Sequence, residues 1–366
     1  MAETGFKLRS EAGVVAWGAL TEEQREAGKQ VHGLLREMAV STEKVDKPKP
    51  SFLPRLDKTR HNRVLLIDGG RGSGKTELLL TVLDFWRSYF LDEQPKGAPV
   101  YDDVDALHPD IKASYSLRGR VVPVGLLDLH PLPPSTNLLF HIIGRFERVV
   151  EWLEEDGKAE HQPAAWHFSG SSELDSRKTW QGLLKAAAAG WDGNVKERGA
   201  RLDLEAYAME LEESERQRLN VVDTFAAFLD ALVKDFPRRC NLNKPPMPMP
   251  LFVLAVDDAD MDPSRSVELL ETVRMLWHPR LAFVLTGHSE LFVHTLAEHF
   301  LGELRQPLKG SGVVASELVG LVENRPHLRL ANDVYEKIIP TGHRCRVLPI
   351  SPPQVMTVEV LEGEGA

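Results

Sequence analysis

The sequence predicts an α/β protein built on a five-stranded parallel sheet with helices on both faces. Two observations predict this class. Five short apolar runs begin near residues 63, 120, 251, 281 and 345, and segments with helical character separate them. Strands that alternate with helices favour a parallel sheet, because each return crossing is long enough to hold a helix. Ligands of such sheets bind at the carboxyl ends of the strands, which is where the polar motifs of this chain fall.

The most informative stretch is residues 63–76, which spells RVLLIDGGRGSGKT. An apolar strand leads into a glycine-rich turn, and a helix is expected to begin near Lys75. The turn matches GxxxxGK[ST], the phosphate-binding loop pattern. A glycine cluster can also be an ordinary turn, but here the strand, the loop, the lysine and the threonine coincide. The residues that we predict to bind nucleotide are Gly69, Gly70, Arg71, Gly72, Ser73, Gly74, Lys75 and Thr76.

Each part of this loop suits a triphosphate. Glycines let successive backbone N–H groups turn toward phosphate oxygens, and the N-terminus of the following helix favours an anion. Lys75 is expected to place its charge against the β- and γ-phosphates of ATP, which makes it a catalytic candidate. The hydroxyl of Thr76 is expected to bind Mg²⁺.

A second motif follows the apolar run at residues 251–256, which leads directly into Asp257 and Asp258. An acid at the end of such a strand can hold Mg²⁺ together with Thr76, and its neighbour can orient or deprotonate the attacking water. We therefore predict Asp257 as a metal ligand and Asp258 as the general base. Paired acids also occur in ordinary loops, so this assignment depends on the glycine-rich loop upstream.

A third motif ends the apolar run at residues 281–285, where Thr286, Gly287 and His288 follow. In an ATPase with an additional strand between the loop-bearing strand and the acid-bearing strand, this strand end faces the γ-phosphate. Thr286 or His288 could then sense hydrolysis, and His288 is our third catalytic candidate. The alternative is a plain N-cap turn for the helix that follows.

The rest of the chain divides around these motifs. Thr21 and Gln24 form a predicted capping box for a helix whose apolar stripe needs a partner surface. The linker that follows, residues 41–62, either packs on its own domain or is an arm that reaches the base or a neighbouring subunit. The insertion is predicted to contain two amphipathic helices, and residues 92–119 are predicted to be loop. The predicted parts are an N-terminal helical arm and linker (1–60), the first part of the core (61–155), a mainly helical insertion (156–250), the second part of the core (251–350) and a tail (351–366).

The composition bounds the class of protein. A hydrophobic content of 42% with 27% charged residues is that of a soluble globular chain. The formal net charge of -10 argues against a broad nucleic-acid-binding surface and leaves open a local basic groove. Cys240 and Cys345 are too few for a disulfide framework, and no signal peptide or membrane span is apparent. We therefore expect a reduced, cytoplasmic protein without a membrane segment.

One segment of the chain resembles a known group. The run VLAVDDADMDPSRSVELLETVRMLWHPRLAFVLTGHSELF resembles the Walker B to sensor region of KAP-type P-loop NTPases and their STAND and AAA+-like relatives. The later VYEKIIPTGHRCRVLPI is similar to their YxxK-like helix and a strand ending in Leu-Pro. The resemblance spans residues 63–92, 120–150 and 251–350. It implies an ASCE-type P-loop NTPase that binds ATP and Mg²⁺, with Pro349 near the adenine.

Further implications concern partners. The LLDLHPLPPSTNLL segment is similar to the second-strand region of large ATPases of bacterial anti-phage defence systems. The resemblance implies a homo-oligomer, as a ring or stack, in which a neighbouring subunit supplies an arginine; Arg274, Arg280 and Arg344 are candidates. In the related families a helical lid follows the last strand, so we expect a truncated chain, with the effector in a C-terminal region or in a separate protein.

Two functional hypotheses remain. The first is an Mg²⁺-dependent ATPase whose hydrolysis drives conformational change or assembly. The second is a nucleotide-gated scaffold or sensor that binds ATP or ADP with little turnover. Multiple-turnover release of phosphate separates them.

Overall fold

The structure is a computed structural model, and it describes residues 14–41, 63–90, 107–133, 136–155, 175–190, 204–240, 249–305 and 326–348. The expected adenine contact Pro349, the linker at residues 42–62 and the tail at residues 351–366 lie outside the described residues. The statements below concern the described part of the chain.

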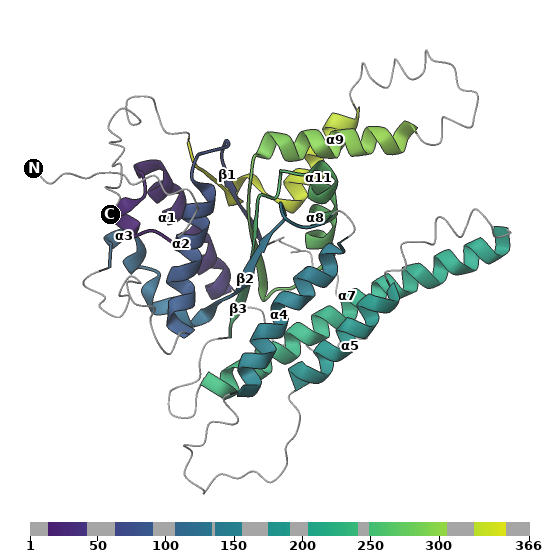
Figure 1. Cartoon of the computed structure of the whole chain (residues 1–366), viewed down its shortest axis with the longest axis horizontal. Coiled ribbons are helices and arrows are strands. Elements are labelled where there is room, and N and C mark those ends of the chain that lie inside the picture. The colour runs from purple at the N-terminus through teal and green to yellow at the C-terminus, as the bar shows by residue number, and fades with distance from the viewer. Residues whose placement is uncertain are drawn as a thin grey trace, which may run out of the picture.

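The core is a five-stranded parallel sheet, as predicted (Figure 1). Its spatial order is β2-β3-β4-β1-β5, so that β4 lies between β1 and β3. The three central strands are buried at every residue, as their continuous apolar runs predict. The strands are β1 (Val64–Asp68), β2 (Val121–Asp128), β3 (Leu251–Asp257), β4 (Leu281–Gly287) and β5 (Arg344–Arg346).

Helices cover both faces of this sheet. In Figure 1, α1 (Glu22–Ser41), α2 (Lys75–Arg87) and α3 (Pro109–Lys112) lie on the left of the sheet. In β1, Leu65 and Ile67 contact these helices, whereas Val64 and Leu66 face the opposite layer, because side chains alternate along a strand. The opposite layer contains α4 (Leu138–Glu155), α5 (Asp175–Gly190), α7 (Leu204–Cys240), α8 (Pro263–Met275), α9 (Ser289–Arg305) and α11 (Pro326–Ile338). Among the described helices, none combines the length and apolarity needed to cross a membrane.

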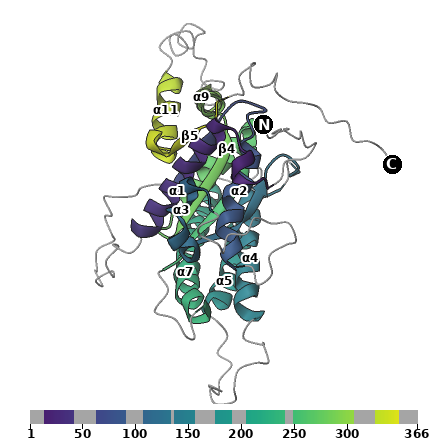
Figure 2. The ribbon, with the colours of Figure 1, turned by 90° about the vertical axis from the view of Figure 1, so that its left-hand side faces the viewer.

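The N-terminal helix packs against α2, which provides the partner surface that its apolar stripe needs. The predicted capping box is present: the Thr21 N–H donates to Gln24 Oε1 at 2.8 Å, and the Gln24 N–H donates to Thr21 Oγ1 at 3.2 Å. Ala27, Val31 and Leu35 are fully buried in the cluster that α1 shares with α2. Figure 2 shows α1 and α2 side by side in front of the sheet.

The insertion differs from the prediction. One helix of 37 residues, α7, replaces the two amphipathic helices that were expected. The sequence between the two apolar stripes contains no glycine or proline, so nothing there interrupts a helix. Its C-terminal half packs into the core, with the Phe225 and Phe228 rings 5.9 and 5.6 Å from the Phe146 ring of α4.

Shorter helices also appear where loop was predicted. Within residues 92–119, the predicted loop contains α3 and most of the 3₁₀ helix η4 (Tyr115–Arg120). The insertion also contains α5, which packs along α7. Three other 3₁₀ helices are described, η1 (Trp17–Ala19), η3 (Ser88–Phe90) and η7 (Thr341–His343).

Candidate functional site

The glycine-rich loop connects the buried strand β1 to the first turn of α2. Glycine is required at Gly69, because a Cβ there would lie 2.7 Å from both Ser73 Oγ and the Val347 carbonyl oxygen. Gly74 has a φ of 78°, in the left-handed region that glycine adopts readily. A Cβ at Gly74 would also lie 2.0 Å from Gln24 Nε2. Glycine is therefore needed at Gly69 because of the surrounding atoms, and at Gly74 because of both the backbone conformation and the surrounding atoms.

The loop gathers donors and a positive charge. The N-cap of α2, Gly74, supplies no side-chain cap, so the N–H groups of the first helical turn keep their hydrogen-bonding capacity. The Ser73 side chain is buried, and its hydroxyl has no hydrogen-bond partner in the described structure. Lys75 Nζ donates to the carbonyl oxygens of Gly69 and Gly70 at 2.7 and 2.9 Å, which places the ammonium over the loop. This is an arrangement suited to an anion.

Asp257, the last residue of β3, contacts the first turn of α2. Thr76 Oγ1 donates to Asp257 Oδ1 at 3.2 Å, although the two residues are 181 positions apart. Thr286 Oγ1, which is fully buried at the end of β4, donates to the same carboxylate oxygen. The structure thus brings together the threonine and the aspartate that the sequence singled out for metal binding.

Asp258 lies one residue beyond β3 in a special environment. Its φ is 49°, which is uncommon for a residue other than glycine, and its N–H donates to Thr286 Oγ1 at 3.0 Å. Partial burial raises the pKa of the Asp258 carboxyl, and the charges of Asp257, Asp128 and Asp260 raise it further, while His130 opposes them. A carboxylate with a raised pKa is a better proton acceptor than an ordinary aspartate.

The third catalytic candidate, His288, directly precedes the first residue of α9. Its N–H donates to Asp260 Oδ2 at 2.9 Å, and its carbonyl oxygen accepts the Leu291 N–H at 3.0 Å. Its Nδ1 is buried and has no hydrogen-bond partner in the part of the chain that the structure describes. Of the two sensor candidates, Thr286 is the one that contacts Asp257. The catalytic assignment of His288 stays a prediction.

The sequence did not single out Asp68, the last residue of β1. Its carboxylate accepts hydrogen bonds from the Ser289 N–H at 2.9 Å and from Ser289 Oγ at 2.7 Å. Its backbone carbonyl accepts the Val347 N–H at 2.7 Å. The start of the glycine-rich loop is thereby tied to α9 and to the end of β5, and no local pattern in the sequence signals these contacts.

Gln24 was recognised only as part of a capping box. The structure adds that its Nε2 donates to the carbonyl oxygen of Gly74 at 3.2 Å, while Oε1 caps α1. The side chain is only 3% exposed. The helix α1 is therefore joined to the glycine-rich loop through one amide group.

No protein-family model matches this chain, and no curated protein matches it. The residues described above and their arrangement are thus the basis for a functional proposal.

The three arginines named as candidates differ in their surroundings. Arg344 lies over the Tyr335 ring, 4.4 Å from its centroid, and forms an ion pair with Glu336 at 2.7 Å. Arg280 is 8% exposed and contacts the sulfur of Met249. Arg274, in the last turn of α8, has an exposed side chain. Of the three, Arg274 is therefore the one presented at the surface.

The donor set near Thr76 fits Mg²⁺ only in combination with a phosphate. Among the described residues, no group of three or more His, Cys, Asp or Glu side chains is arranged to hold a metal ion. Mg²⁺ is commonly bound by one or two carboxylates together with substrate phosphates and water. Asp257 and the Thr76 hydroxyl, 3.2 Å apart, are a suitable protein contribution to such a site.

Proposed function

We propose that this chain is an Mg²⁺-dependent ATPase of the ASCE-type P-loop NTPase class, in which ATP binding and hydrolysis drive conformational change or assembly. The observation that carries the proposal is the hydrogen bond of 3.2 Å between Thr76 and Asp257. It joins the loop expected to hold the phosphates to the acid expected to hold the metal. An ordinary glycine-rich turn is not expected to form a hydrogen bond with an acid at the end of a different strand.

The sheet order gives independent support. The strand β4 lies between the loop-bearing strand β1 and the acid-bearing strand β3. The three strands are parallel, so their carboxyl ends lie together at one end of the sheet. This is the arrangement expected of an ATPase with an additional strand between the two. Fold alone does not determine function, so the proposal depends on the residues at the carboxyl ends of these strands.

The roles of the side chains follow from their positions. Lys75 and the loop N–H groups would bind the phosphates, and Thr76 and Asp257 would bind the metal ion. Mg²⁺, when bound, supplies positive charge that offsets the charge developing on phosphate oxygens. Asp258 would orient the attacking water and accept its proton, because its raised pKa increases its basicity.

We further propose that the active form is a homo-oligomer in which Arg274 of one subunit serves the site of the next. Arg274 lies near the end of α8, about 18 Å along the helix axis from the N-cap residue Asp262 at the rise of ~1.5 Å per residue. Because β3 and β4 are parallel, α8 runs from the carboxyl end of β3 back toward the amino end of β4, so Arg274 lies toward the end of the sheet opposite its own site and is placed to serve a neighbour's site. Arginines supplied by a second protein raise the rates of phosphoryl transfer by large factors.

The proposal is tested by measuring ATP turnover and ATP binding on the same samples. Lys75→Ala and Asp257→Asn are each expected to reduce Mg²⁺-dependent turnover by about a hundredfold or more, because they remove charge from the phosphates and the metal. Lys185→Ala, an exposed lysine on α5, is the matched control and should leave turnover unchanged.

Two other outcomes have defined meanings. ATP binding that is sensitive to Lys75→Ala but unaccompanied by phosphate release, in an assembled sample, would favour the nucleotide-gated scaffold. Turnover that is the same in the wild type and in Lys75→Ala would contradict the ATPase proposal.

A further inference from the structure

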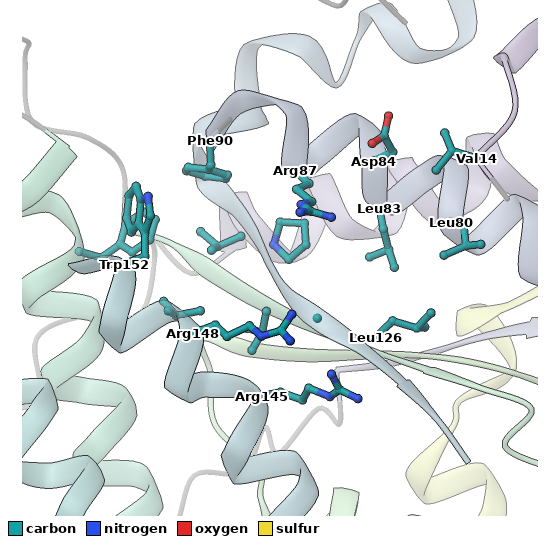
Figure 3. Close-up of a pocket in the computed structure, with 16 residues that line it drawn as sticks. Val14, Leu80, Leu83, Asp84, Arg87, Phe90, Leu126, Arg145, Arg148 and Trp152 are labelled. Carbon is teal, nitrogen blue, oxygen red and sulfur yellow. The ribbon is translucent and has the colours of Figure 1, made fainter. Parts of the chain in front are cut away.

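A second concave region lies away from the glycine-rich loop, at the free edge of the sheet. In the described structure β2 pairs only with β3, and its other edge faces a cavity of about 550 Å³ between α2 and α4 (Figure 3). Small-molecule sites are typically about 300–1,000 Å³. None of the residues lining this cavity belongs to the loop at residues 69–76 or to the acid pair of β3.

One end of the cavity is an aromatic wall formed by Phe90, Trp152 and Phe236. The Phe90 ring lies 6.3 Å from the Trp152 ring and 5.8 Å from the Phe236 ring, and the last two are 5.6 Å apart. Leu83 of α2 and Val124 of β2 extend the apolar surface between the helices. This wall can receive the apolar body of a ligand.

The same cavity carries an excess of positive charge. Its lining includes three arginines, Arg87, Arg145 and Arg148, against one carboxylate, Asp84. Figure 3 shows Arg145 and Arg148 beside β2, whereas the Asp84 carboxylate points away from that strand. The charge of the lining is therefore opposite in sign to the formal net charge of the chain, which is -10, and it favours an anion. Arginine is the side chain best matched to carboxylate and phosphate groups.

The edge of β2 is poorly suited to an extended peptide. Pro123 has no N–H to donate, and the register of β2 against β3 shifts between Pro123 and Gly125. A proline and an irregularity of this kind are features that protect an edge strand from pairing with another strand. The occupant is therefore a compact molecule.

We propose that this cavity binds a small amphipathic anion, with its apolar body against the aromatic wall and its carboxylate or phosphate at Arg145 and Arg148. The cavity is connected to the candidate nucleotide site through shared elements. The helix α2 begins with Lys75, and residues further along the same helix line the cavity. The strand β2, which also lines the cavity, ends at Asp128, in register with Asp257. The binding proposal itself does not depend on ATP hydrolysis.

Calorimetric titration of the full chain with three ten-carbon ligands tests this proposal. Decanoate and decyl phosphate, each below its micelle-forming concentration, distinguish a carboxylate from a phosphate headgroup, and decanol is the neutral match. We expect at least one anion to bind with a stoichiometry of one, and decanol to bind at least tenfold more weakly. The double variant Arg145→Gln, Arg148→Gln should lower anion affinity at least tenfold and leave decanol unaffected, while the exposed control Arg329→Gln should change neither.

Two additional variants keep the test decisive. Leu126→Trp places a larger side chain in the cavity without changing its charge, and it should abolish binding of anion and alcohol alike. Should circular dichroism show that the double variant is unfolded, Arg148→Gln alone, at an exposed position, should lower anion affinity at least threefold. Equal affinities for decanol and both anions, or anion binding that survives all these substitutions, would overturn the proposal.

Discussion

Gln24 of α1 donates a hydrogen bond of 3.2 Å to the carbonyl oxygen of Gly74, which is the N-cap residue of α2. The same amide accepts the Thr21 N–H at 2.8 Å, so its two ends hold two different elements. This contact links the N-terminal helix directly to the glycine-rich loop. A change in the position of α1 would therefore change the position of Gly74 in the candidate phosphate site.

The first prediction separates this contact from the capping of α1. Gln24→Glu keeps an acceptor for the Thr21 N–H but replaces the donor to Gly74 with a buried carboxylate that faces the Gly74 carbonyl oxygen, so the melting temperature should fall. ATP affinity should fall about tenfold, which corresponds to the loss of ~1.4 kcal/mol. Titration of each variant with ATP by calorimetry measures the change.

Two variants control for charge and for the cap. Gln24→Met removes the donor without adding a carboxylate, and it should weaken ATP binding as Gln24→Glu does. Thr21→Ala weakens the capping box and keeps the contact with Gly74, so its ATP affinity should stay near that of the wild type. Wild-type affinity in both Gln24 variants would show that the contact has no role in nucleotide binding.

The second prediction concerns the buried hydroxyl of Thr286. Thr286→Val keeps the shape of the side chain and removes the donor to Asp257 and the acceptor for the Asp258 N–H. Stability should fall by about 1–3 kcal/mol because two buried groups lose a partner. The apparent affinity for Mg²⁺ in the turnover assay should fall as well, since Asp257 is no longer oriented.

Thr286→Ser restores the hydroxyl and is expected to recover most of the Mg²⁺ affinity. The matched control is Thr272→Val on α8, which removes a buried hydroxyl bonded to the Glu268 carbonyl oxygen. That variant should lose stability without a change in the Mg²⁺ dependence of turnover. If both valine variants shifted the Mg²⁺ dependence equally, the special role of Thr286 would be refuted.

The third prediction is that Asp258 lowers the stability of the folded protein and is needed for activity. Its pKa is raised in the folded protein, mainly by burial and then by Asp257. The ionised carboxylate therefore lowers the unfolding free energy at pH values above the folded pKa, and this loss disappears as the pH falls through that pKa. Asp258→Asn removes the penalty, and its melting temperature at pH 7 should be higher than that of the wild type. Turnover should fall by about 10²–10⁴-fold if Asp258 is the general base.

Thermal unfolding and phosphate release, measured at pH 7, test both halves of this prediction. The control is Asp223→Asn, at an exposed position of α7, which should change neither quantity. Full turnover in Asp258→Asn would remove Asp258 from the mechanism even if the stability gain were observed.

The fourth prediction concerns a buried histidine of α1, His32. His32 is enclosed by aromatic rings, with centroids 5.6 Å from Trp17, 4.9 Å from Phe85 and 5.5 Å from Trp86. Burial, followed by the charge of Arg36, lowers the pKa of His32 to about 3. Its contribution to stability is therefore complete above pH ~6.5, where the unfolded histidine is neutral, and is lost as the pH falls from there toward 3.

Between these limits the wild type should lose up to about 1.4 kcal/mol of unfolding free energy per pH unit through this group. His32→Phe keeps the aromatic packing and cannot be protonated, so its unfolding free energy should fall less steeply. Denaturant titrations at pH 7, 6, 5 and 4 provide the comparison. Parallel pH profiles for the two proteins would contradict the assignment.

Much of the fold follows from local sequence patterns. The apolar runs predicted all five strands. The start of α8 also has a local signal, since Pro263 is its first residue and the Asp262 carboxylate accepts the Ser264 N–H at 2.9 Å. These features depend on residues that are neighbours in the chain, so the pattern contains the information. The prediction of two helices in place of the continuous helix α7 was wrong, because two apolar stripes fit one long helix as well as two short ones.

The sequence by itself determined the strands, the glycine-rich loop and the acids that follow β3, since each is a property of a short segment. Only the tertiary structure decided that Thr286 contacts Asp257, that Gln24 reaches Gly74 and that three arginines gather beside the free edge of β2. The physical reason is that these contacts join residues far apart in the chain. They depend on the order of the strands and on how the helices cross them, which a local pattern does not specify.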